Sequence, residues 1–282
     1  MRSIPKVDFR LRPPYGELTE QTGMWESVAG RDDVVTPRSL REESMDALIE
    51  EMDRAGIEYG VALGRRTPAG EHGATGRVSN EDLAELQDEY GDRFVGFAGI
   101  DPDEDGAVEE VERAVSDLGL QGVSLDPGKY DPPRTMDDES LHPVYERCAD
   151  LGVPVSVTLS LIAVPDVSYL RQVTIERAAA AFPDLQFVIA HAAWPRSVEA
   201  LALAAHYDNI WIGPDIYLNT PNPGRGRFLA DLQDGVADRV LWGSAYPYYP
   251  LVESVDGFAE LDIPEHVARK VCSENPRALL GL

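Results

Sequence analysis

Five polar residues each come at or just after the end of a short apolar run, which is where strands present side chains to a site. They are Asp8, Arg10, Asp126, His191 and Asp215. Carboxylates and neutral imidazole can transfer protons or bind a divalent metal. A guanidinium can only donate hydrogen bonds, because it stays protonated and has no lone pair to offer. The pattern therefore predicts acid–base or metal-assisted chemistry on an anionic compound.

His191 and Asp215 are the candidates for proton transfer. Imidazole titrates near neutral pH, so His191 at a strand end can act as a general base and acid. Asp215 follows a later apolar run and is a candidate proton acceptor. A structural role stays open for each: a hydrogen-bonded histidine, or an aspartate that bonds the backbone of its own loop.

The remaining polar residues have two interpretations each. Arg10 is expected to bind a substrate carboxylate through its planar fork of donors. Asp8 is either a metal ligand or the partner of Arg10 or Arg12, since a buried acid normally needs compensation. Asp126 is either a third ligand or the partner of Lys129, or it caps its own loop.

Aromatic rings and further cations occur in the same segments. Such a lining suits a small planar carboxylate, lactone or amide, although packing is the alternative role for each ring. The expected substrate-binding residues are Arg10, Arg12, Lys129, Tyr130, Trp194, Tyr217 and Tyr246, with Arg65 and Tyr248 nearby in the sequence pattern.

These residues need a scaffold of alternating strands and helices. Short runs rich in branched residues alternate with longer amphipathic segments, which indicates repeated βα units. The pattern predicts a closed (β/α)8 barrel of the TIM type, and an open doubly wound sheet is the alternative. The expected strands are Ile4 to Phe9, Tyr59 to Leu63, Phe94 to Ile100, Gly122 to Leu125, Val153 to Leu159, Gln186 to Ala190, Ile210 to Ile212 and Arg239 to Trp242.

The expected helices end close to the next strand, whereas longer segments follow the strands. Leu118-Gly119 and Leu151-Gly152 are typical helix ends before a short turn. The longer segments belong at the carboxyl ends of the strands, where barrel enzymes build their sites. Main helices are expected over Ser39 to Ala55, Asn80 to Tyr90, Ala107 to Leu118, Leu141 to Leu151, Tyr169 to Phe182 and Val198 to His206.

Length and composition favour one soluble domain over residues 1–282. The chain has 282 residues, 43% of them hydrophobic, and no apolar run long enough for a membrane span. Its formal net charge of -25 opposes binding to nucleic acid or to an anionic membrane. We expect a cytoplasmic protein with a small-molecule substrate, and adaptation to high salt would explain the acidity. The two cysteines lack metal-site spacing and are expected to be reduced.

Four motifs in order resemble the amidohydrolase-related family of metal-dependent TIM-barrel hydrolases and decarboxylases. They are Val-Asp-Phe-Arg at 7–10, Ala-His-Ala-Ala-Trp-Pro at 190–195, Trp-Gly-Ser-Ala-Tyr-Pro at 242–247 and the closing 274–282. That family usually begins with His-x-His or Glu-x-His and has Gly-Ser-Asp-x-Pro near its end. This chain differs at Arg10 and at Ala245, which stands in the place of the aspartate.

The resemblance places metal ligands at the ends of the first, fifth, sixth and last strands. It assigns Asp8 and Arg10 to the first of these positions, Thr158 to the fifth strand, His191 to the sixth and Ala245 to the last. Only Asp8 and His191 can bind a metal. Asp126 on the fourth strand would complete a three-ligand site for one Zn or Mn ion.

The resulting expectation is an amidohydrolase-like hydrolase acting on a small carbonyl compound. In that interpretation Asp8, Asp126 and His191 hold a metal that activates water, while Asp215 or His191 moves protons. The first alternative is a lyase or decarboxylase in which Arg10 binds a carboxylate and His191 protonates carbon. The second is a barrel that binds a small ligand without catalysis. Assembly into a homo-oligomer stays open.

Overall fold

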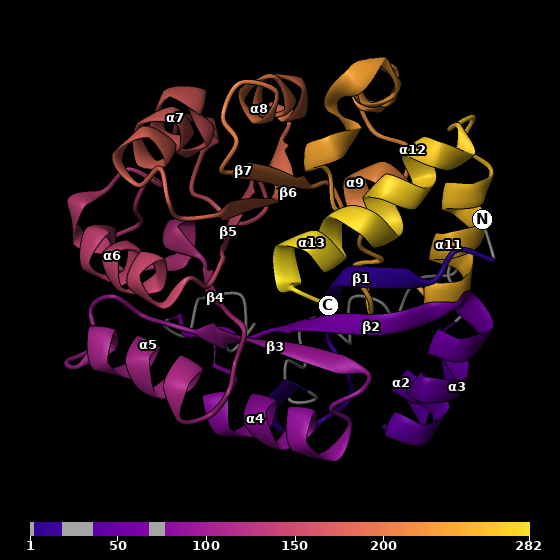
Figure 1. Ribbon diagram of the computed structural model, residues 1–282, viewed down its shortest axis with the longest axis horizontal. Helices are drawn as coiled ribbons and strands as arrows, with labels where there is room; N and C mark the ends of the chain where they lie inside the picture. Colours follow the sequence, from indigo (N-terminus) through magenta and orange to yellow (C-terminus); the bar gives the residue numbers. More distant parts are fainter. Residues whose placement is uncertain (1–2, 19–35, 68–76) are drawn as a thin grey trace.

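The computed structural model describes residues 3–18, 36–67 and 77–282, and its centre is a sheet of parallel strands (Figure 1). Seven strands pair in sequence order, each with its chain neighbours. This confirms seven of the predicted strands, and β6 continues past its predicted end through His191. The strands are β1 (Lys6–Leu11), β2 (Ile57–Leu63), β3 (Phe94–Gly99), β4 (Gly122–Leu125), β5 (Val155–Ser160), β6 (Phe187–Trp194) and β7 (Ile210–Gly213).

An eighth segment closes the sheet into a barrel without forming a regular strand. Val240 bridges to Ile212 on β7, and the Trp242 carbonyl accepts a hydrogen bond of 3.0 Å from the Phe9 amide on β1. The strand predicted over Arg239 to Trp242 is therefore wrong in type but right in place. The amide of Trp242 donates to the Val271 carbonyl at 3.0 Å, so it is not available for pairing with β1.

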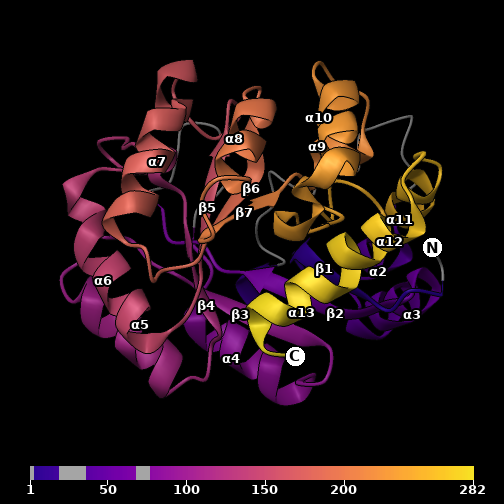
Figure 2. The same cartoon turned by 45° about the horizontal axis from the view of Figure 1, so that its top comes forward.

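Helices surround the strands (Figures 1 and 2). The helix predicted from Ser39 is divided in two, because Ser44 caps a new helix by accepting a hydrogen bond from the Ala47 amide. The helices are α2 (Arg38–Arg41), α3 (Met45–Ala55), α4 (Asn80–Glu89), α5 (Ala107–Ser116), α6 (His142–Leu151), α7 (Gln172–Ala181), α8 (Ser197–Ala204), α9 (Ile216–Asn219), α10 (Arg225–Asp231), α11 (Leu251–Ala259), α12 (Glu265–Arg269) and α13 (Asn275–Leu280).

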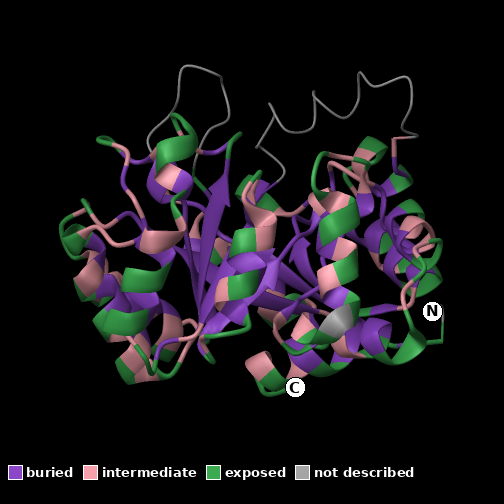
Figure 3. Ribbon diagram, turned by 90° about the horizontal axis from the view of Figure 1, so that it is seen from above, coloured by how far each residue is buried: buried purple, intermediate pink, exposed green. Residues whose placement is uncertain are grey.

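The apolar core has two parts. The larger part lies between strands and helices, and the strands are buried along nearly their whole length (Figure 3). The smaller part joins residues such as Phe9 on β1, Phe97 on β3 and Val188 on β6. Because these strands are not neighbours in the sheet, this cluster fills the inside of the barrel. Cys148 and Cys272 are free and buried, as expected.

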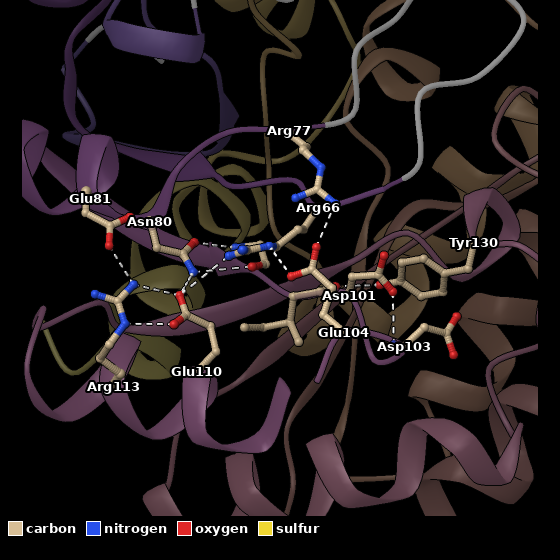
Figure 4. A network of polar contacts seen from close by, with 12 residues as sticks. Arg66, Arg77, Asn80, Glu81, Asp101, Asp103, Glu104, Glu110, Arg113 and Tyr130 are labelled. Carbon is tan, nitrogen blue, oxygen red and sulfur yellow. Dashed lines mark hydrogen bonds and ion pairs between the residues drawn. The ribbon is translucent and has the colours of Figure 1, made fainter. Parts of the chain in front are cut away.

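A polar network fixes the carboxyl end of β3 to the neighbouring helices (Figure 4). The Asn80 side chain accepts a hydrogen bond of 2.9 Å from the Gly99 amide and donates one of 2.6 Å to Glu110. Glu104 in turn pairs with Arg66 at 2.6 Å.

Among the helices described, none combines the length and the apolar character needed to span a bilayer.

Candidate active site

His191 and Asp215 form a buried hydrogen-bonded pair at the ends of β6 and β7. The Nδ1 atom of His191 lies 2.7 Å from Oδ1 of Asp215, and the His191 amide donates to Oδ2 at 3.2 Å. Burial lowers the pKa of His191, although Asp215 opposes that shift. The imidazole is therefore neutral near pH 7, with Nδ1–H donating a hydrogen bond to Asp215 and the Nε2 lone pair left for a substrate.

Backbone conformation sets the direction of both side chains. His191 and the two residues after it have φ values of 63°, 51° and 51°, and Asp215 has a φ of 38°. L-residues rarely adopt this left-handed region, and such residues cluster at functional sites. Asp215 is also held by the Ile216 amide, which donates to Oδ1 at 2.7 Å. The local backbone therefore positions the side chains of His191 and Asp215.

Arg10 extends this pair into a chain of three charged or ionisable groups. Its Nε lies 3.6 Å from Oδ2 of Asp215, and its Nη1 is buried without a hydrogen-bond partner. Glycine at position 243 permits this approach: a Cβ atom there would lie 3.1 Å from the Cβ of Arg10. Asp215 has a pKa below its usual value because His191 and Arg10 outweigh the effect of burial.

Asp8 bonds to backbone amides and makes no ion pair with any residue that the structure describes. Its Oδ1 accepts hydrogen bonds from the amides of Ser244 at 2.8 Å and Arg10 at 3.1 Å, while Oδ2 has no partner. The expected pairing of Asp8 with the Arg10 guanidinium is wrong, because Arg10 turns to Asp215 instead. Burial raises the pKa of Asp8 to about 7. A carboxyl in this state is a proton donor near neutral pH.

Asp126 pairs with Arg65 rather than with the expected Lys129. Oδ2 of Asp126 lies 3.1 Å from Nε of Arg65, and both side chains are buried. Burial opposes ionisation of Asp126, but Arg65 and Lys129 outweigh it and hold the pKa below the usual value. Lys129 is only half-buried, and burial together with Arg65 lowers its pKa to about 8.

Two aromatic side chains stack on each other beside His191. The rings of Trp194 and Tyr217 stack with centroids 4.8 Å apart and planes at 9°, and the His191 ring meets Tyr217 edge-on at 5.7 Å. The hydroxyls of Tyr217 and Ser160 lie 2.8 Å apart, which fixes the stack to the end of β5. Both predicted rings thus lie next to the proton-transfer pair.

The two other predicted rings are used structurally. The Tyr130 hydroxyl donates to the Ile100 carbonyl at 2.9 Å, and its ring is buried. Tyr246 is fully buried, with its hydroxyl 2.7 Å from the Ser39 hydroxyl under α2. Both hydroxyls therefore bond to protein groups.

The described side chains do not fit a divalent metal. No three His, Cys, Asp or Glu residues in the described part of the chain lie close enough to share an ion. Asp126 is occupied by Arg65, and Nδ1 of His191 by Asp215. The three-ligand site expected from Asp8, Asp126 and His191 is therefore not assembled in this arrangement. The guanidinium groups of Arg65 and Arg10 contact Asp126 and Asp215, and neither guanidinium can bind a metal because it has no available lone pair.

The raised pKa of Asp8 predicts a specific pH dependence of stability. A buried acid that keeps its proton in the folded state stabilises the fold below its unfolded pKa of about 3.8, and this contribution is lost as pH rises to about 7. Wild-type protein should lose about 2 kcal/mol relative to Asp8→Asn between about pH 5 and about pH 7. Urea unfolding at both pH values measures this difference.

The control for this measurement is Asp262→Asn, since Asp262 is exposed. Its stability should follow that of the wild type across the same range. A stability difference between wild type and Asp8→Asn that stays constant with pH would show that Asp8 ionises normally in the folded protein.

Sequence reasoning missed three contributors to this site. Arg65 had been noted only as a nearby cation, and its pairing with Asp126 joins segments 61 residues apart. Ser160 and Gly243 act through contact with Tyr217 and with Arg10, respectively. Only the position of Ser160, at the end of a predicted strand, could have drawn attention to it.

Comparison with known proteins gives a consistent family. The model of the family described as Amidohydrolase matches residues 28–282. An uncharacterized TIM-barrel protein from Bordetella bronchiseptica superposes with a TM-score of 0.85 and 33% identity, covering 98% of each chain. A dihydroxybenzoic acid decarboxylase from Polaromonas sp. JS666, solved with manganese and the inhibitor 2-nitroresorcinol, superposes with a TM-score of 0.71 and 18% identity, covering 98% of this chain and 97% of that one.

A shorter match is to a decarboxylase from Dictyostelium discoideum. Its description is 2-amino-3-carboxymuconate-6-semialdehyde decarboxylase, and it is 29% identical over 79 residues. That match covers 28% of this chain and only 21% of the relative. Both named activities among these proteins remove carbon dioxide from an acid.

Proposed function

The chain belongs to the amidohydrolase family, and from this premise we propose that it is a lyase of the decarboxylase type acting on a small aromatic carboxylate. The observation that carries the proposal is the buried chain Arg10–Asp215–His191 with Asp8 beside it. It combines a cationic hydrogen-bond donor that can bind an anion (Arg10), a neutral base (His191) and a protonated acid (Asp8) in one site. Hydrolysis, the first expectation from sequence, receives less support, because the named relatives are decarboxylases.

Arg10 orients the substrate by its carboxylate. Its Nη1 donor is buried and unpartnered, so a carboxylate oxygen can replace the missing acceptor. Asp215 holds the other side of the guanidinium and keeps it fixed. The stacked rings of Trp194 and Tyr217 give an aromatic substrate a surface to lie against. In this proposal Arg10 and the two rings bind and orient the substrate, and other residues transfer the protons.

Asp8 and His191 divide the proton chemistry. Asp8 is the proton donor, because burial keeps its carboxyl protonated up to a pKa of about 7. It protonates the ring carbon that bears the carboxylate. The carbon–carboxylate bond then breaks, its electron pair returns to the ring, and carbon dioxide leaves. His191 accepts a proton at Nε2 from a ring hydroxyl, which raises electron density on that carbon, and Asp215 stabilises the imidazolium that forms.

The test is release of labelled carbon dioxide. Purified protein is incubated with hydroxybenzoates labelled at the carboxyl carbon, and the evolved gas is measured by mass spectrometry. Release that depends on Asp8 and His191 supports the proposal. Cleavage of an ester, lactone or amide panel without carbon dioxide would favour the hydrolase instead, and ligand binding with neither reaction would favour a binding barrel.

We expect chelation to leave activity unchanged. The described donors do not form a three-ligand site, so dialysis against EDTA should remove no group on which turnover depends. Elemental analysis before and after dialysis, together with carbon dioxide release, measures this. A stoichiometric Mn or Zn ion whose removal abolishes turnover and whose return restores it would contradict the expectation.

A further inference from the structure

Arg12 is a deeply buried cation that lacks an acidic partner among the described residues. Its side chain is 3% exposed, and its Nε has no hydrogen-bond partner. Its backbone is fixed, because the Arg12 amide donates to the Tyr246 carbonyl at 3.1 Å. Asp126 is the acid that acts on Arg12 electrostatically, but Arg65 already holds it.

The two buried arginines nearest to Arg12 in this site each have an acidic partner. Arg10 contacts Asp215 and Arg65 contacts Asp126, and both are buried. Arg113 on α5 is more exposed and still pairs with Glu110 at 2.7 Å (Figure 4). Burial of an isolated charge is costly unless a counter-charge compensates it. Arg12 therefore differs from Arg10 and Arg65 by combining deep burial with the lack of an acidic partner among the described residues.

Lys129 adds a second cation at the same place. It is half-buried, and no described carboxylate forms an ion pair with it. Arg12 and Lys129 repel each other and both repel Arg65, since each acts on the pKa of another member of the group. A cluster of like charges of this kind is stable when a ligand supplies the missing negative charge.

We infer that the substrate carries two anionic groups, the first bound by Arg10 and the second by Arg12 together with Lys129. The inference rests on the proposed function for the first group only. The second group is a carboxylate or another oxyanion, because guanidinium donors match planar and tetrahedral oxyanions. A neutral substituent would leave Arg12 uncompensated.

Binding of simple aromatic acids tests the inference without requiring turnover. Isothermal titration is carried out with benzoate and with the three benzenedicarboxylates, whose second group lies at the 2, 3 or 4 position. At least one dicarboxylate should bind about tenfold or more tightly than benzoate, because a charge-assisted contact is worth that much. Equal affinity for benzoate and all three dicarboxylates would overturn the inference.

Variants assign the second group to Arg12. In Arg12→Met the advantage of the best dicarboxylate over benzoate should fall to about twofold or less, while benzoate affinity stays near the wild-type value. Lys129→Met should reduce the same advantage and serves as the second variant if Arg12→Met does not fold. The control Arg113→Met, which alters a paired arginine on the outer helix α5, should retain the full advantage. Equal loss for benzoate and dicarboxylate would also overturn the assignment.

The two proposals fail separately. Preference for a dicarboxylate that depends on Arg12, without release of labelled carbon dioxide, would leave the two-anion site standing and refute the lyase. Carbon dioxide release from monocarboxylates without any preference for a second acid group would do the reverse.

Discussion

Turnover falls by about 100-fold to 10,000-fold when His191 is replaced by Ala, the range typical of general acid–base groups. The fold remains intact, because His191 contributes mainly its contacts with Asp215 and Tyr217 rather than apolar burial. Initial rates of carbon dioxide release measure the loss, and circular dichroism with thermal unfolding checks the fold. The expectation concerns kcat, since Arg10 still binds the substrate.

A matched control is His206→Ala. His206 is exposed after α8 and contacts the ring of Tyr207. Its replacement should leave turnover unchanged. Folded His191→Ala with near-normal kcat would remove the imidazole from the mechanism and leave Asp8 as the only proton-transfer group.

Replacing Arg10 by Ala weakens binding of an aromatic carboxylate by roughly 30-fold or more, which corresponds to about 2 kcal/mol or more for a buried charged contact. Arg10→Lys should retain part of the affinity, because a point charge remains while the planar fork is lost. Titration calorimetry with benzoate measures both variants. Elemental analysis should show no change in metal content, since a guanidinium cannot donate a lone pair.

Arg269→Ala provides the control for the loss of a cation. Arg269 is exposed on α12 and pairs with Glu265. Its removal should leave benzoate affinity at the wild-type value. Unchanged affinity in folded Arg10→Ala would show that Arg10 serves only as the counter-ion of Asp215.

The fold follows from local sequence patterns with one informative exception. Strands such as β4 are buried on both faces. A strand of this kind is a short, mainly apolar run between turns, which can be recognised in the sequence. The eighth segment has a similar run, but its Trp242 amide bonds to Val271, a contact that no local pattern can indicate. Likewise, the division of the helix at Ser44 depends on a capping bond, for which the sequence offers serine as only one of several signals.

The positions of the site residues could be predicted better than their partners. Strand ends meet at one end of a barrel, so His191, Asp215 and Arg10 were expected together and do lie together. The partner of each charge depends on side-chain direction, and several carboxylates and cations compete there. For Asp126 the sequence left a metal ligand, a partner of Lys129 and a loop cap open, whereas the structure pairs it with Arg65 from the segment after β2.

The left-handed residues around the site imply a conflict between selection for robustness and selection for activity. Ala192, Ala193 and Ala245 have φ values of 51°, 51° and 62°, which L-residues adopt at a cost of about 1 kcal/mol or more. Glycine would relieve that cost, so a screen for thermostable variants should enrich glycine at these positions. The same change would give His191 more freedom to turn away from Asp215. Substitutions at these positions that raise thermal stability should therefore lower turnover.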